Sequence, residues 1–288
     1  MLGHESLGRV LEAPATGDLG PGDLVVGIVR QPDPEPCLSC AAGEWDMCHN
    51  GRYTEHGIKQ LHGFLRERYR IGPGHVVKLD PALKRTGVVL EPTSVVAKAW
   101  DHIERIAART VWDSKIVLVV GAGPIGLLAA LLAVQRGLEV HVLDRVTSGP
   151  KPALVADLGA TYHTGTLAEA VGRADVIVEC TGVEELVLDA IAKAAPDGIV
   201  CLTGVSSAGR TITIDRGALN RELVLDNAVV FGTVNANRRH YQAAAAALAK
   251  ADPGWLERLI TRRVLLDRWP DALQRQPDDV KAVIELPA

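Results

Sequence analysis

The chain has 288 residues, more than one hydrophobic core usually holds, so we expect two domains rather than a small disulfide-stapled scaffold. Apolar residues make up 47% and charged residues 23%, values that exclude an intrinsically disordered chain. The 31 Lys and Arg residues against 35 Asp and Glu residues give a net charge of −4, so we expect no nucleic-acid partner.

The five cysteines, an odd number, and an N-terminus without a secretory apolar segment favour a reducing compartment, and we expect a cytoplasmic protein. Residues 116–134 carry no charge, and their length alone would allow a membrane span. Three glycines and a proline interrupt this stretch, so we interpret it as a short buried strand followed by a helix. We therefore expect no membrane association.

The first part of the chain, up to about Pro92, is rich in glycine and proline and irregular in pattern. A short strand is predicted at 24–29, after a Gly-Pro-Gly-Asp turn at 20–23. From 93 to 109, apolar residues recur at helical spacing and predict an amphipathic helix. We place a domain boundary near Pro92.

Beyond residue 109 the chain alternates apolar strands with helices. Strands are predicted at 116–120, 140–143, 176–180, 199–202 and 229–231, with helices at 124–136 and 184–194 between them. Repeated βα units predict an α/β domain with a Rossmann-type, doubly wound parallel sheet. After residue 234 the pattern is helical, with late strands at 262–266 and 282–286 that we assign to the first domain.

Residues 121–126 read Gly-Ala-Gly-Pro-Ile-Gly, a GxGxxG motif that follows a predicted strand and opens a predicted helix. In this context Gly121 permits the tight turn, Gly123 lets the backbone approach a pyrophosphate, and Gly126 allows close packing of helix on strand. The helix N-terminus offers unpaired N–H groups to the phosphates. We predict a dinucleotide site, with a glycine turn that serves packing alone as the alternative.

Two neighbouring residues give opposite indications about the dinucleotide. Asp144 ends the second strand, where an acid would accept hydrogen bonds from the ribose hydroxyls of NAD. Arg145 follows directly and could pair with the 2′-phosphate of NADP. The choice between the two cofactors stays open at this point.

Three cysteines, Cys37, Cys40 and Cys48, fall within a short segment rich in proline and glycine, which is typical of a lobe held together by zinc. They leave one zinc position unfilled, so buried or incidental thiols are the alternative. Near the start of the chain, His4 and Glu5 form a pair that, taken alone, a solvated surface explains equally well.

Seven further segments lie along nearly the whole chain: Leu2–Ser6, Pro21–Val25, Asp46–Cys48, Tyr53–Ile58, Leu61–Phe64, Leu90–Thr93 and Gly232–Tyr241. With the glycine motif, they resemble the zinc-containing medium-chain dehydrogenase/reductase superfamily. The Gly-His-Glu and GxGxxG elements are typical of the whole superfamily. The Glu-His-Gly-Ile, His-Gly-Phe and Val-Asn-Ala-Asn-Arg-Arg-His-Tyr stretches narrow the resemblance to its glucose 1-dehydrogenase branch.

The resemblance implies an irregular, mainly β (GroES-like) catalytic domain over 1–92, with a cysteine lobe at about 33–50. It implies a dinucleotide-binding domain over 93–235 and a segment, 236–288, that returns to the catalytic domain. Family members carry several tens of residues before the Gly-His-Glu motif, so we interpret this catalytic domain as N-terminally truncated. Pro34 stands where the family's lobe has its first of four cysteines.

Site residues follow from the resemblance by position. It assigns His4, Glu5 and Glu91 to a catalytic zinc and Cys37, Cys40 and Cys48 to a candidate structural zinc. It assigns Glu55, Glu91, Asn235 and Asn237 to the substrate. It assigns Gly121, Gly123, Pro124, Ile125, Gly126, Asp144, Arg145, Thr181 and Asn235 to the cofactor, NADP or NAD.

The expected activity is zinc-assisted oxidation of glucose, or a related aldose, at the anomeric carbon to the lactone, with hydride transfer to NAD(P). Two alternatives stay open: a zinc-dependent polyol or alcohol dehydrogenase, and a non-catalytic NAD(P)-binding remnant. The resemblance also implies a homo-oligomer, a dimer or tetramer, for which the strand at 229–234 is the candidate edge.

Overall fold

The computed structural model describes residues 2–207, 209 and 213–287. The chain divides into two compact units, one from Met1–Lys98 with Val234–Ala288 and one from Ala99–Thr233. The sequence suggested boundaries at 92 and 235. The first boundary falls later, between Lys98 and Ala99, because helix α2 (Leu90–Ala107) runs through this region without a break.

The first unit is built from short strands and a few helices. Its described strands form three small sheets: β1 (Gly8–Arg9), β2 (Leu24–Gly27) and β6 (Val76–Lys78); β3 (Arg30–Gln31), β4 (Thr54–His56) and β5 (Gln60–Leu61); and β13 (Arg262–Leu265) with β14 (Ala282–Glu285). Its helices are α1 (Leu38–Ala41), the start of α2, α8 (Arg238–Lys250), α9 (Pro253–Leu259) and α10 (Trp269–Leu273). The late strands lie in this unit.

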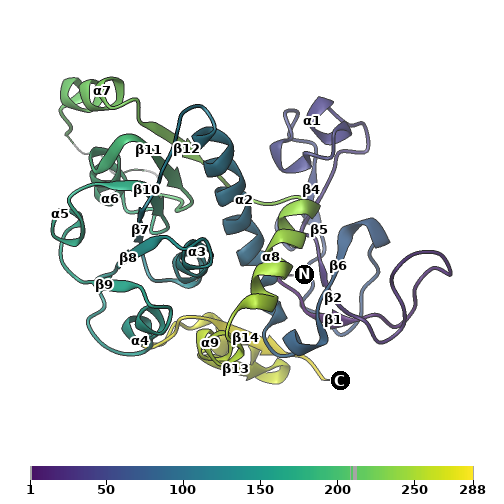
Figure 1. Ribbon diagram of the computed structural model, residues 1–288. Helices are drawn as coiled ribbons and strands as arrows, with labels where there is room; N and C mark the ends of the chain where they lie inside the picture. Colours follow the sequence, from purple (N-terminus) through teal and green to yellow (C-terminus); the bar gives the residue numbers. More distant parts are fainter. Residues whose placement is uncertain (1, 208, 210–212, 288) are drawn as a thin grey trace. The chain divides into compact units, whose positions relative to one another are not determined.

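The second unit contains a six-stranded sheet in the order β12-β11-β10-β7-β8-β9, with every neighbouring pair parallel (Figure 1). The strands are β7 (Ile116–Val120), β8 (Glu139–Leu143), β9 (Thr161–His163), β10 (Ala174–Glu179), β11 (Ala194–Leu202) and β12 (Val229–Gly232). The helices between them are α3 (Pro124–Val134), α4 (Pro150–Asp157), α5 (Leu167–Ala170), α6 (Glu184–Ala192) and α7 (Arg216–Leu225). The predicted Rossmann-type sheet is confirmed.

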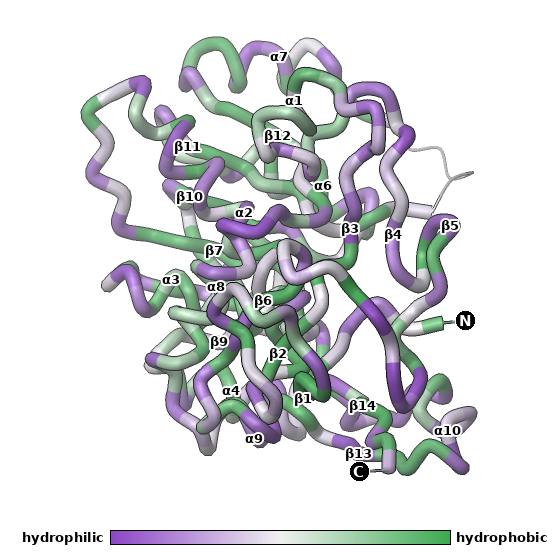
Figure 2. Tube along the Cα trace, turned by 90° about the vertical axis from the view of Figure 1, so that its right-hand side faces the viewer, coloured by the Kyte–Doolittle hydropathy of each residue, from purple (hydrophilic) through white to green (hydrophobic). Residues whose placement is uncertain are grey.

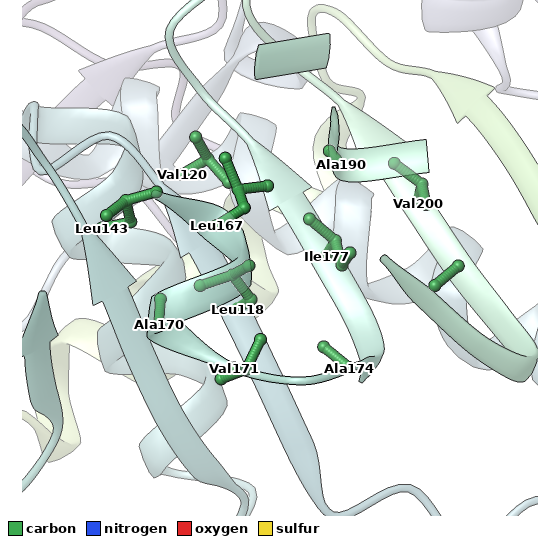
Figure 3. Packing of buried hydrophobic residues seen from close by; sticks show 11 residues of the cluster. Leu118, Val120, Leu143, Leu167, Ala170, Val171, Ala174, Ile177, Ala190 and Val200 are labelled. Carbon is green, nitrogen blue, oxygen red and sulfur yellow. The ribbon is translucent and has the colours of Figure 1, made fainter. Parts of the chain in front are cut away.

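Alternate residues of the central strands pack on opposite faces of this sheet. Leu118 of β7 and Ile177 of β10 belong to a buried cluster that α5 and α6 cover (Figure 3). Val119 points to the other face, where its Cγ1 lies 3.3 Å from the position that a Cβ on Gly126 of α3 would take. Helices therefore cover both faces, and each fully buried Val, Leu or Ile side chain stabilises the fold by about 1.5–3 kcal/mol.

The uncharged stretch 116–134 forms strand β7, a glycine turn and helix α3. Figure 2, in which hydrophobic residues are green, shows β7 as an apolar strand. Within the residues that the structure describes, no helix combines the length and the hydrophobicity that crossing a bilayer requires. Strand β12 pairs with β11 and ends the sheet on that side, so the predicted edge position is confirmed.

Candidate active site

The glycine motif adopts the conformation that its spacing predicts. Gly121 has φ +102°, which an L side chain rarely adopts. A Cβ on Gly126 would lie 1.7 Å from the carbonyl oxygen of Gly121, so only glycine allows α3 to start this close to β7. A Cβ on Gly123 would meet no atom within 4 Å, which leaves the backbone open to a ligand. Pro124 and Ile125 begin α3, whose first N–H groups lack helical acceptors.

Asp144 follows β8, as expected, but its carboxylate is bound by the protein itself. It accepts hydrogen bonds from the N–H groups of Ala122 (2.8 Å) and Val146 (3.0 Å) and from Nζ of Lys151 (2.8 Å). Burial alone would raise the pKa of Asp144, yet the bonds from Lys151 and the two amides hold it below the ordinary value. Arg145 is exposed beside this group. Two cations therefore stand where the ribose of a dinucleotide is expected.

Thr181 lies at the glycine turn. A Cβ on Gly121 would come within 2.7 Å of its Cγ2. The backbone N–H of Thr181 donates to Oε1 of Glu179 at 2.6 Å, and the N–H of Gly182 donates to the same oxygen at 3.1 Å. Because Glu179 is fully buried at the end of β10, it fixes this loop beside the motif.

His4, Glu5 and Glu91 come together in the first unit. One ligand atom from each lies within 4.8 Å of the others, and Nε2 of His4 is 4.0 Å from Oε2 of Glu91. Glu91 stands in the first turn of α2. The segment that carries His4 and Glu5 is held by the hydrogen bond from the N–H of Phe64 to the carbonyl of Gly3, at 2.7 Å.

The electrostatics of this group favour a cation. Burial raises the pKa of Glu91 to about 8, and the charges of Glu5 and Glu55 act in the same direction, while Lys281 opposes them. Nζ of Lys281 lies 2.5 Å from the Glu5 carboxylate. Buried carboxylates near one another are unfavourable unless a positive charge compensates them. One imidazole and two carboxylates are also a donor set that zinc accepts, so these residues fit a zinc ion.

Glu55 of β4 is buried and bonded to polar side chains. Its Oε1 accepts hydrogen bonds from Nε of Arg30 at 3.0 Å and from Nδ2 of Asn235 at 2.6 Å. The Arg30 guanidinium also stacks on Tyr53, 3.6 Å from the ring centroid. No described residue donates a hydrogen bond to Oε2 of Glu55, so this oxygen is available to a ligand hydroxyl.

Asn237, which the resemblance assigned to the substrate, has its side chain engaged within the protein. Its Nδ2 donates to Asp46 (2.7 Å) and to Glu44 (3.1 Å), and its oxygen accepts from the N–H of Arg239 as the N-cap of α8. Only 1% of Asn237 is exposed. These bonds use all the polar hydrogens of its amide, so the geometry does not offer this side chain to a sugar.

Cys37, Cys40 and Cys48 also come together, with their sulfur atoms within 4.8 Å of one another. Hydrogen bonds from the backbone N–H groups of Cys40 and His49 lower the pKa of Cys37 to about 6. Burial raises the pKa of Cys40 to about 11. Among the described residues, no fourth His, Cys, Asp or Glu atom joins the three sulfur atoms.

Several site residues escaped sequence reasoning: Arg30, Asp46, Lys98, Lys151 and Lys281. One signal was visible, because Lys98 falls among the apolar residues of a predicted amphipathic helix, where a charge needs a buried partner. Lys151 pairs with Asp144, seven residues earlier. The partners of the others lie far along the chain, and no motif spacing links them.

A parallel dinucleotide-type sheet inserted into a mainly β unit with a His-Glu-Glu group is the architecture of the medium-chain dehydrogenases. A family model described as the C-terminus of glucose dehydrogenase matches residues 84–286. Glucose 1-dehydrogenase of Methanocella arvoryzae is 38% identical over 299 residues, covering 100% of this chain and 83% of the relative. Glucose 1-dehydrogenase 2 of Vulcanisaeta moutnovskia is 35% identical over 292 residues, covering 99% and 82%.

Glucose dehydrogenase of Haloferax mediterranei, solved in complex with NADP, Zn and gluconolactone, superposes with a TM-score of 0.91 at 30% identity. The match covers 100% of this chain and 83% of that one. The chain belongs to the glucose dehydrogenase family.

Proposed function

We propose that the protein oxidises glucose, or a closely related aldose, at the anomeric carbon to the lactone, with transfer of a hydride to NADP and with zinc as Lewis acid. The names of the two relatives and the NADP, Zn and gluconolactone of the Haloferax structure support this proposal. The observation that carries it is the buried Glu55 carboxylate, whose Oε1 is held by Arg30 and Asn235 while Oε2 is left for a hydroxyl.

His4, Glu5 and Glu91 would hold the zinc. When bound, zinc would supply a Lewis acid that lowers the pKa of the anomeric hydroxyl so that it loses its proton, and NADP would supply the acceptor for the hydride from the anomeric carbon. Lys281 holds the Glu5 carboxylate in place. Glu91 is fixed by its position in the first turn of α2. These residues therefore form the part of the site that binds the reacting end of the sugar.

Glu55 and Asn235 would orient the sugar through its other hydroxyls. A buried carboxylate with one free oxygen accepts a hydrogen bond from a hydroxyl, and a substrate without that hydroxyl leaves the oxygen unpaired. Sites of this kind discriminate strongly against analogues that lack the hydroxyl. We therefore expect polyhydroxylated substrates to be preferred over simple alcohols.

For the dinucleotide, we infer a preference for NADP over NAD. Lys151 occupies the Asp144 carboxylate, which weakens its ability to accept hydrogen bonds from a ribose diol. The exposed Arg145 adds a second cation, and a guanidinium pairs well with a phosphate.

We further propose a homo-oligomer, a dimer or tetramer, formed through the edge strand β12, and a cytoplasmic location. β12 is the last strand of its sheet, and an edge strand offers unpaired N–H and C=O groups to a second copy. The structure contains no disulfide among the residues it describes, which fits a reducing compartment. Light scattering of the purified protein measures its molar mass in solution. A mass equal to that of the monomer would contradict the proposed dimer or tetramer.

Steady-state assays test the activity. Reduction of NADP and NAD is measured with glucose, galactose, xylose, sorbitol and ethanol, before and after dialysis against a zinc chelator. We expect aldose oxidation that chelation removes and added zinc restores. Oxidation of alcohols or polyols but not of aldoses would instead identify a polyol or alcohol dehydrogenase. Binding of the dinucleotide without turnover of any substrate would indicate a non-catalytic NAD(P)-binding remnant.

A further inference from the structure

A fully buried ion pair lies in the first unit, outside the proposed zinc and sugar ligands. Nζ of Lys98 is 2.9 Å from Oδ2 of Asp46, and the two side chains are 2% and 0% exposed. Burying two charges costs desolvation energy that their attraction often only offsets, so such a pair is weak evidence for stability. Both side chains also bind other groups, and these contacts indicate the role of the pair.

Both partners bind the short loop between β12 and α8. Nζ of Lys98 donates to the carbonyl oxygen of Val234 at 3.1 Å. The Asp46 carboxylate accepts from Nδ2 of Asn237 at 2.7 Å. These two bonds fall on either side of Asn235, so the ion pair fixes the loop just before and just after that residue.

The backbone of Asn235 lies in the left-handed region, with φ +63°. Non-glycine residues rarely occupy this region, although asparagine does so more often than most. Such conformations persist only where surrounding contacts impose them, and they gather at functional sites. In this conformation the Asn235 side chain donates to Oε1 of Glu55 at 2.6 Å.

We propose that Lys98 and Asp46 are positioning residues for sugar binding, which hold the loop 234–237 so that Asn235 stays bonded to Glu55. This inference rests on the proposed function, in which Glu55 and Asn235 bind the sugar. Asn237 acts here as the link between Asp46 and the loop, which accounts for a buried amide without a free polar hydrogen.

A purely structural ion pair is the competing explanation, and paired variants separate the two. Lys98→Met removes the charge and the bond to Val234, but it leaves Asp46 buried without its cation. Lys98→Met combined with Asp46→Asn removes both charges and keeps an acceptor for Asn237. Removing one member of a buried pair leaves an uncompensated charge, whereas replacing both members is often much less destabilising. Lys84→Met, at an exposed lysine of the same unit, is the matched control.

If Lys98→Met does not fold, the test is made with the double variant alone. We expect its KM for glucose to rise about tenfold or more, the effect of losing one hydrogen bond to a charged group. Its KM for NADP, its kcat and its zinc content should stay within about twofold. A crystal structure should show Asn235 outside the left-handed region and no longer bonded to Glu55.

Two outcomes overturn the inference. One is a folded double variant in which Asn235 keeps its φ and its bond to Glu55. The other is a fall in kcat and thermal stability together, with the KM for glucose unchanged. If the wild-type protein does not oxidise glucose, the proposed function fails, but the crystallographic comparison still decides whether Lys98 and Asp46 hold Asn235.

Discussion

Lys151 and Asp144 form an ion pair, with Nζ 2.8 Å from Oδ2 and each side chain 10% exposed. The sequence indicated Asp144 as an acceptor for the ribose hydroxyls of NAD. In the structure its charge is instead compensated by a lysine of the following helix, α4. The pair places a positive group at the end of β8, and two predictions depend on it.

Lys151→Met should reduce the preference for NADP. Without the ammonium, the Asp144 carboxylate would repel a 2′-phosphate and would be free to bind the ribose diol of NAD. We expect the ratio of kcat/KM for NADP to that for NAD to fall about tenfold or more. Lys115→Met, at an exposed lysine of the same unit, should leave the ratio unchanged. An unaltered ratio in Lys151→Met would show that this pair does not set the preference.

Asp144→Asn should lower stability at neutral pH but not in acid. The folded pKa of Asp144 lies below its unfolded value of about 3.9, so its contribution is present above that value and is lost as pH falls through the lower, folded pKa. Charged hydrogen bonds are worth about 1.5–3 kcal/mol. Denaturant unfolding of both proteins between pH 7 and pH 3 should show the difference shrinking towards acid. A difference that is constant with pH would contradict the ionised state of Asp144.

His4→Ala should remove the proposed catalytic zinc. The remaining carboxylates, Glu5 and Glu91, form too small a ligand set to bind zinc tightly. We expect the loss of one equivalent of zinc by elemental analysis and a fall in kcat/KM for glucose of at least about a hundredfold. The exposed His62 provides the control variant, His62→Ala, which should keep both zinc and activity. Retention of zinc by His4→Ala would place the metal elsewhere.

Glu55→Gln should weaken sugar binding while dinucleotide binding persists. The change keeps the size of the side chain but replaces an ionised acceptor by a neutral amide and leaves Arg30 without its carboxylate. We expect the KM for glucose to rise about tenfold or more and the KM for NADP to stay within twofold. The exposed Glu67→Gln is the matched control. A normal KM for glucose in Glu55→Gln would rule out this carboxylate as a sugar ligand.

The three sulfur atoms of the cysteine lobe form a candidate structural zinc site. We expect Cys40→Ser to lose one equivalent of zinc, lower the melting temperature and leave KM for glucose unchanged, because a lobe metal stabilises the fold rather than the reaction. Elemental analysis and thermal unfolding, with Cys201→Ser as a buried cysteine outside the lobe, test this. An unchanged zinc content would mean that the lobe holds together without metal.

Local patterns predicted five of the six strands of the second unit but missed the short strand β9 and helices α4, α5 and α7. Strand β7 was predicted at its observed bounds, since an apolar β-branched run followed by glycines has few other interpretations. The glycine motif was equally predictable, because the local backbone geometry requires glycine at its positions. The grouping of His4, Glu5 and Glu91 was predicted only from the family resemblance. No spacing rule in the sequence indicates that these three residues lie close together.

Long-range polar partners were beyond the sequence. Arg30 and Glu55 pair across two strands, and Lys98 reaches Asp46 from another element, so their contacts follow only from the folded chain. For Asn237, which a motif assigned to the substrate, the fold uses the side chain as a helix cap, and its contact with a sugar stays a prediction. Motifs identify residues, but the packing around them decides which atoms remain available.

The bond from Lys98 to Val234 joins the last residue before the second unit to the first residue after it. The 135-residue stretch Ala99–Thr233 therefore departs and returns through adjoining points of its host, in the manner of an inserted cassette. Exchanging that stretch between related chains would require only one closely spaced pair of junctions. The cofactor specificity would then be transplanted without rerouting the backbone that carries the proposed sugar ligands.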